Sequence, residues 1–131
     1  MKRLGLVLAA AVLAWSACSR SDSSSTRFTA AASESVNDVE LGNFTAVRAR
    51  FDPTMLVSLS EDQLKTAWQQ YLAMFGSFRS QGKPETLKRG SLTVVNVPLV
   101  MSKMEGQARV TFDADGKVGG LFFLRTGVPV P

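Results

Sequence analysis

The most regular apolar pattern lies in residues 60–75, where hydrophobic side chains recur at the three- and four-residue spacing of one helix face. Ser60 and Gln63 have the spacing of a capping box at the start of this segment, and Gly76 is a residue type that commonly follows the end of a helix. The apolar stripe consists of Leu64, Trp68, Tyr71, Leu72 and Phe75. This pattern predicts an amphipathic helix that lies across a sheet.

Two further helical patterns precede this segment. Residues 28–41 are rich in alanine and carry apolar side chains at helical spacing, and Gly42 follows as a stop. Residues 43–51 predict a second, shorter helix that Asn43 can cap. Asp52 comes directly before a proline, and its simplest role is to cap the turn that follows. The first half of the domain is therefore expected to be helical.

The second half of the domain has the alternating pattern and the turn residues of β-strands. We predict strands over residues 77–83, 85–89, 91–104, 106–113 and 117–125. On the longest strand, the side chains that share the face toward the core are Val95, Val97, Leu99 and Met101. Pro98 lacks a backbone donor and indicates a bulge or an edge. Helices followed by strands predict an α+β domain, with N-terminal helices packed on an antiparallel sheet.

The last two strands are expected to form a hairpin whose loop sets their register. Residues 113–117 suit a three-residue loop, with Gly116 in the left-handed position. Continuing the register outward from this loop places Phe122 on the core face. The same register places Leu121 and Phe123 on the opposite face of the sheet.

That opposite face would be more apolar than a solvated surface needs to be, because Leu121 and Phe123 would share it with other apolar side chains. The others are Leu92, Val94 and Val100. Two explanations stay open. A partner covers this face, with Leu121 and Phe123 as interface candidates, or the C-terminal residues 128–131 cover it.

The N-terminus has a different pattern. A short basic start is followed by an apolar run over residues 4–13, which is shorter than the ~20 residues that span a bilayer as a helix. We therefore predict a signal peptide over residues 1–17. Residues 18–27 are polar and rich in serine, and are expected to form a lipidated N-terminus and a flexible tether. The folded domain is predicted over residues 28–127, with a short tail at 128–131.

Cys18 indicates a particular type of signal peptide. Ser16 and Ala17 precede it as in a bacterial lipobox, although Trp15 stands where that motif usually has an aliphatic residue. The resemblance implies that Cys18 is acylated and holds the mature protein on a membrane outside the cytosol, the outer membrane if the cell is Gram-negative. The alternative is an ordinary secretory signal that ends at a chance thiol.

Composition narrows the chemistry further. The 131 residues include no histidine and one cysteine, which excludes a Ser-His-Asp triad, a histidine-ligated metal site and an intramolecular disulfide. Without the basic residues of the leader the formal charge falls from +4 to +2, which does not favour nucleic acid as a partner. We predict no cofactor and no metal.

The order of several motifs carries a family resemblance. These motifs are Gly42-Asn43-Phe44, Phe51-Asp52, the helix with Leu64 and Trp68, the strand over residues 94–99, and the ending Gly120-Leu121-Phe122-Phe123. They resemble the DUF3887 family, domains of unknown function that occur as secreted proteins or lipoproteins and also fused to α/β-hydrolase domains. The resemblance implies an NTF2-like or cystatin-like cone, in which a curved antiparallel sheet wraps around helices. It implies no specific activity.

The first functional hypothesis is a lipid-anchored, non-catalytic module that binds a small ligand, a peptide or an envelope protein. It predicts a pocket of roughly a few hundred Å³. The candidate ligand-binding residues are Trp68, Met55 and Phe122.

Two alternatives stay open. An isomerase-type or hydrolase-assisting enzyme would need an acid and a proton donor in one dry cavity, and the chain offers Asp52 and Tyr71. We assign no catalytic residues, because Asp52 has a simple capping role. The other alternative is a dimerisation or assembly element that would use Leu121 and Phe123.

Overall fold

The computed structural model describes residues 20–131, with side chains from residue 25 onward. Within this part of the chain, helices are followed by strands, which confirms the α+β class. The helices are α1 (Arg20–Glu40), α2 (Phe44–Arg48), α3 (Pro53–Ser58) and α4 (Glu61–Phe75). The strands are β1 (Phe78–Gln81), β2 (Glu85–Arg89), β3 (Leu92–Met101), β4 (Glu105–Phe112) and β5 (Val118–Arg125). The expected signal peptide and Cys18 lie outside the described residues.

The strands form one open antiparallel sheet in the order β1-β3-β4-β5, with β2 also paired to β3. β2 pairs with the first half of β3 and β1 with its last residues, so the two short strands follow one another along one edge of β3. Pro98 lies where the partner of β3 changes from β2 to β1. A proline is tolerated there because the ladder is already interrupted. The arrangement is consistent with an NTF2-like cone.

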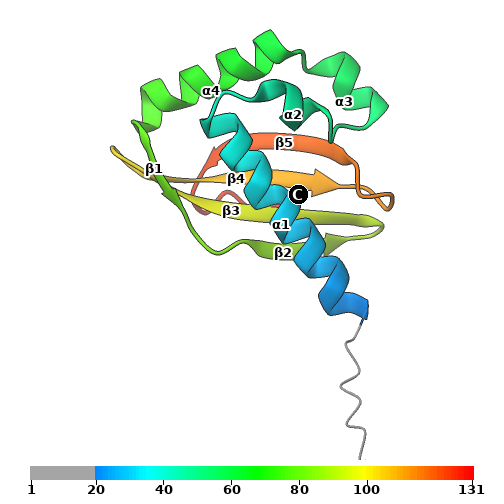
Figure 1. Ribbon diagram of the computed structural model, residues 1–131. Coiled ribbons are helices and arrows are strands. Elements are labelled where there is room, and N and C mark those ends of the chain that lie inside the picture. The colour runs from blue at the N-terminus through cyan, green and yellow to red at the C-terminus, as the bar shows by residue number, and fades with distance from the viewer. Residues whose placement is uncertain (1–19) are drawn as a thin grey trace, which may run out of the picture.

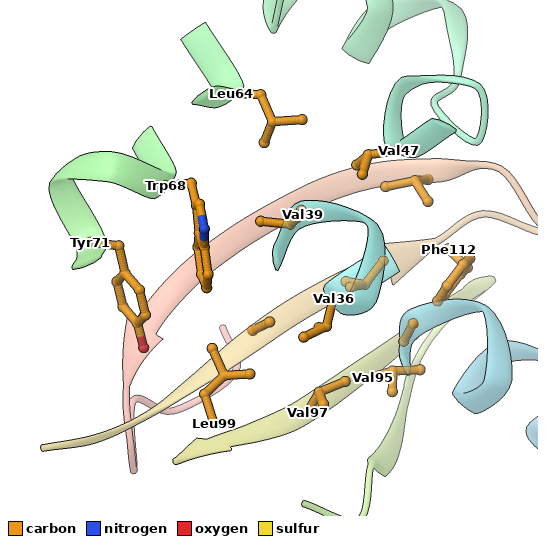
Figure 2. Packing of buried hydrophobic residues seen from close by; sticks show 14 of the residues in the cluster. Val36, Val39, Val47, Leu64, Trp68, Tyr71, Val95, Val97, Leu99 and Phe112 are labelled. Carbon is orange, nitrogen blue, oxygen red and sulfur yellow. The ribbon is translucent and has the colours of Figure 1, made fainter. Parts of the chain in front are cut away.

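Figure 1 shows α1 crossing one face of the sheet and α4 running along its β5 side. We call this covered face the inner face. Its core consists of apolar side chains from α1, α4 and the three longest strands, together with Val47 of α2 and Phe51. Figure 2 shows Trp68 of α4 and Val36 of α1 pointing into it. Val95, Val97 and Leu99 of β3 are buried in this core, so the face predicted for the longest strand is confirmed.

α1 begins earlier than expected, because the polar segment predicted as a flexible tether is helical from Arg20. Phe28 and Ala32 are buried against the sheet, and the turns before them extend a helix that tertiary packing has already formed. Adding a residue to an existing helix costs far less than starting one. The composition of this segment was therefore a poor guide to its conformation.

The link between α1 and α4 contains one helix that the sequence analysis missed. Asn43 occupies the N-cap position of α2 as predicted, but its side chain makes no capping hydrogen bond. Asp52 does cap: its Oδ1 accepts a hydrogen bond of 2.7 Å from the backbone N–H of Met55, at the start of α3. Pro53 opens α3, where its fixed φ and missing N–H are well tolerated.

The predicted start and end of α4 are confirmed. Ser60 Oγ accepts from the Gln63 backbone N–H at 3.2 Å, and Gln63 Oε1 accepts from the Ser60 N–H at 2.9 Å. Gly76 follows the helix with φ 91°, a conformation that favours glycine. The capping box and this glycine fix the helix so that its apolar stripe faces the sheet.

The hairpin of β4 and β5 differs from the predicted register by one residue. Phe112 pairs with Val118 as expected, but Thr111 then pairs with Gly120 and Val110 with Leu121. Gly119 is thus an extra residue, a β-bulge. The bulge lies beside Asp52, whose Oδ2 would be 3.2 Å from a Cβ at position 119. A one-residue shift exchanges the two faces of a strand, so every side chain of β5 beyond the bulge faces the side opposite to the one predicted.

Candidate functional site

The candidate ligand residues do not meet in one pocket. Trp68 is 5% exposed, and its ring lies 5.0 Å from that of Phe123 and 5.7 Å from that of Tyr71. Met55 is partly buried and packs against the core. Phe122 is 54% exposed and lies on the other face of the sheet, because of the bulge. The cavities that Phe122 lines include neither Trp68 nor Met55.

The interface candidates are also displaced. Leu121 and Phe123 pair with Val110 and Ala108 on the inner face and pack against the core. The expectation that they form an exposed surface is wrong for the same reason, since the predicted register lacked Gly119. Phe123 lies against the rings of Trp68 and Tyr71 of α4.

Tyr71 is held by contacts inside the domain. Its hydroxyl donates a hydrogen bond of 2.9 Å to the backbone oxygen of Leu124. Burial raises the pKa of Tyr71 to about 12, and a hydrogen bond with the Gln107 backbone opposes part of this rise. The hydroxyl fits against β4 because residue 106 is glycine, where a Cβ would come within 1.8 Å of the oxygen.

Asp52 and Tyr71 are far apart in the fold. Asp52 lies beside Gly119 at the start of β5, and Tyr71 bonds to Leu124 near its end. Five residues of strand separate these points by about 16 Å. The two groups that the enzyme hypothesis would combine therefore belong to different ends of the domain, and each already has a structural partner.

A hollow with a mostly apolar lining that includes two arginines lies on the outer face, the face of the sheet that turns away from α1. It is a groove with a cavity volume of about 370 Å³, and we call it the outer groove. Its walls come from β2, β3, β4, β5 and the C-terminal residues. The lining residues are Arg89, Leu92, Val94, Arg109, Thr111, Phe122, Leu124, Val128, Pro129, Val130 and Pro131.

Arg109 is the one deeply buried charged residue among the side chains that the structure describes, with 5% of its surface exposed. It lies opposite Asn96 on β3, and its Nε donates to Asn96 Oδ1 at 2.8 Å. Its Nη1 donates to the backbone oxygen of Pro129 at 3.1 Å, and its Nη2 donates to that of Val128. Every one of these acceptors is uncharged.

The C-terminal segment, residues 128–131, covers part of the outer face. Val128 and Val130 are half-buried, whereas the two prolines are exposed. Gln107 donates to the Val128 oxygen at 3.4 Å, and Arg89 donates to the Pro131 oxygen at 3.2 Å. The chain's own tail therefore covers part of the outer face, as one of the two explanations expected.

The sequence analysis assigned no role to Arg109. Asn96, Gln107 and Arg109 are neighbours only because of the strand pairing and the path of the tail. One signal was available. Two polar residues at outward positions of adjacent long strands can be cross-strand partners, and Asn96 and Arg109 are directly opposed.

Fold and site together define an α+β domain with a helix-covered inner face and a grooved outer face. The chain matches the DUF3887 family, proteins of unknown function, over residues 32–121, and it belongs to this family. No curated protein and no solved structure matches it. Within residues 20–131, no helix is both long and apolar enough to cross a membrane, and no cluster of three potential metal-ligating side chains is found.

Proposed function

We propose that this protein is a non-catalytic binding module, anchored by a lipid on Cys18 to the outside of a bacterial membrane, and that it binds an apolar small molecule in the outer groove. The membrane location depends on the sequence of the leader, with its short apolar run and its cysteine after small residues. Family membership is compatible with this role and assigns no activity.

The observation that carries the binding proposal is the outer groove itself. Small-molecule sites are usually concave and mostly apolar, with a few polar groups that orient the ligand. The groove has this character, since Leu92, Val94 and Phe122 line it together with Arg109. Phe122 is more than half exposed there, although a phenyl ring gains free energy from burial. A bound ligand would bury it.

The position of the polar groups supports a non-catalytic role. Proton transfer needs an acid and a base within reach of one substrate. Asp52 caps α3 and Tyr71 bonds to β5, and neither lines the outer groove. The polar groups of the groove are arginines and a threonine, which can orient a ligand by donating hydrogen bonds.

Ligand binding can be tested by calorimetry with a ten-carbon alcohol, decanol, and with decyl phosphate, both below their critical micelle concentrations. We expect the full chain to bind at least one of them, and we expect Phe122→Ala to weaken that binding because it removes the largest apolar side chain of the lining. Val57→Ala is the matched control, since Val57 is 88% exposed on α3 and does not line the outer groove. Absence of binding by both compounds, or equal binding by Phe122→Ala, would contradict the proposal.

The anchor requires a separate test in bacterial cells. Cys18→Ser should move the protein from the membrane fraction to the soluble fraction and abolish its labelling by radioactive palmitate. Ser19→Ala is the control, because it leaves the cysteine in place and should stay with membranes. If Cys18→Ser remains membrane-bound as before, lipidation at this residue is not the anchor.

A further inference from the structure

The charge of Arg109 is buried without a countercharge. Among the side chains that the structure describes, no carboxylate forms an ion pair with it. Its hydrogen bonds go to one amide oxygen and to the backbone oxygens of two consecutive residues of the C-terminal segment. Burial of a charge is costly unless it is paired, so this arrangement leaves much of the desolvation cost of the guanidinium uncompensated.

The two tail carbonyls occupy the positions that one anionic group would take. Nη1 and Nη2 donate to neighbouring oxygens from Pro129 and Val128, while Nε is held by Asn96. A carboxylate or a phosphate presents two oxygens to an arginine in a similar forked manner. Such charge-assisted hydrogen bonds are about twice as strong as those to neutral acceptors.

The rest of the outer-groove lining is also suited to an anion with an apolar body. Arg89 lies in the lining as a second cation and donates to the Pro131 oxygen, and no side chain of the lining is acidic. The other side chains from the strands are apolar apart from Thr111. The side chains of the groove therefore combine an apolar floor with two cations and no carboxylate.

We infer that the ligand of the outer groove is an amphiphile with an anionic head on an apolar body, and that its head replaces the C-terminal segment on Arg109. This inference rests on the proposed binding function and adds the class of ligand and the means of entry. The tail residues Val128 and Pro129 act as an internal competitor: they satisfy the guanidinium while the groove holds no ligand, and they leave when a carboxylate or phosphate arrives.

The first experiment compares decyl phosphate, decanoate and decanol by calorimetry on the full chain. We expect the two anionic compounds to bind about tenfold or more tightly than the alcohol, because only they provide a charged partner for Arg109. Comparable affinities of decyl phosphate and decanoate would show that the site recognises negative charge. A large difference between them would show whether the site prefers a phosphate or a carboxylate head group. Equal binding of decanol and the anions would overturn the inference and leave the proposed function standing, whereas no binding at all would remove both.

Two variants locate the effect at Arg109. Arg109→Gln should reduce the preference for the anions to near unity. Arg109 is buried, so Arg109→Gln is complemented by Thr111→Glu, a variant that retains the arginine. Thr111 lies two residues further along the same strand on the same face. A carboxylate at position 111 would compete with the ligand for the guanidinium and should also reduce the preference for the anions. Circular dichroism verifies folding of both. Retention of the full anion preference in either folded variant would contradict the assignment.

Displacement of the tail is measured directly by NMR of the Val130 methyl groups. Decyl phosphate should move these signals toward the positions of an unstructured peptide, and a variant that ends at Gly127 should bind decyl phosphate severalfold more tightly than the full chain. Unmoved Val130 signals at saturation, or weaker binding without the tail, would show that the segment is a wall of the site and not a competitor.

Discussion

The two faces of the sheet are built from alternate residues of the same strands and have opposite characters. On the inner face, Val95, Val97 and Val110 are fully buried beneath helices. On the outer face, Leu92 and Phe122 remain exposed by 40% and 54%, beside a buried arginine. The inner face is closed by elements with regular hydrogen bonding, and the outer face by four residues of irregular chain.

This difference suggests that the inner face determines the stability of the fold and the outer face is available for binding. A helix-covered face makes many fixed contacts, so a change there must lower the free energy of unfolding. A face covered by a short terminal segment can exchange its cover, because few contacts are lost when the segment leaves. We therefore expect substitutions on the inner face to affect folding, and substitutions on the outer face to affect ligands.

The largest expected effect is on the inner face at Trp68. Trp68→Ala removes the ring that packs between Tyr71, Phe78 and Phe123, and should lower the free energy of unfolding by ~3–5 kcal/mol. Urea titration followed by circular dichroism measures the change. Gln69→Ala, exposed on the same helix, is the control and should change little. Near-normal stability of Trp68→Ala would mean that this face is not the core.

The next effect comes from overpacking at Gly106. A Cβ there would lie 1.8 Å from the Tyr71 hydroxyl and 2.8 Å from the Leu124 oxygen, so Gly106→Ala should cost about 1–3 kcal/mol. Tyr71→Phe removes the nearer of these atoms. In a double-mutant cycle, the loss caused by Gly106→Ala should be smaller in the Tyr71→Phe background. Strict additivity would show that the close approach has no energetic consequence.

A smaller effect depends on pH. The pKa of Tyr71 is raised to about 12 in the folded protein, against about 10 when unfolded. Both states hold the proton below pH 10, so this contribution is intact there, and it is lost as the pH rises from 10 to 12, on the order of 2 kcal/mol in all. Tyr71 is the single tyrosine, so absorbance at alkaline pH follows its ionisation alone. The alkaline loss of stability should be less steep in Tyr71→Phe, and equal slopes would refute the assignment.

The smallest effect is expected on the outer face. Arg109→Met replaces a buried charge by an apolar side chain of similar length, and should change the free energy of unfolding by about 1 kcal/mol or less. Its neighbour Val110 faces inward, and Val110→Ala should cost about 2 kcal/mol. Adjacent residues of one strand thus test the comparison directly. A large loss in Arg109→Met would mean that the arginine holds the fold together.

Much of the inner face could be predicted from the sequence. Local signals define α4, since Ser60, Gln63 and Gly76 have residue types that act within a few positions of the helix ends. The core side of β3 followed from simple alternation, and DUF3887 membership agreed with the resemblance found in the motifs. Such patterns depend only on residues that are close in the sequence, so they can be recognised before the fold is known.

The outer face could not be predicted in the same way. Its composition depends on a bulge at Gly119, where Asp52 of a distant segment lies beside the strand, and no local pattern marks the extra residue. Part of the outer face is covered by the C-terminal tail, which contacts Arg109 from nineteen and twenty positions further along the sequence. The same long-range dependence explains why Phe122 and Phe123 were assigned to each other's faces.

The helical start of α1 has a consequence for the proposed lipid anchor. One residue separates Cys18 from Arg20, where the helix begins, and residues 20–27 extend the axis by about 12 Å before the packed part of the domain. A helix in this position would connect the domain rigidly to the lipid-bearing residue, unlike a flexible tether. It would limit tumbling, set the height of the domain above the bilayer, and keep a preferred side turned toward the lipid headgroups.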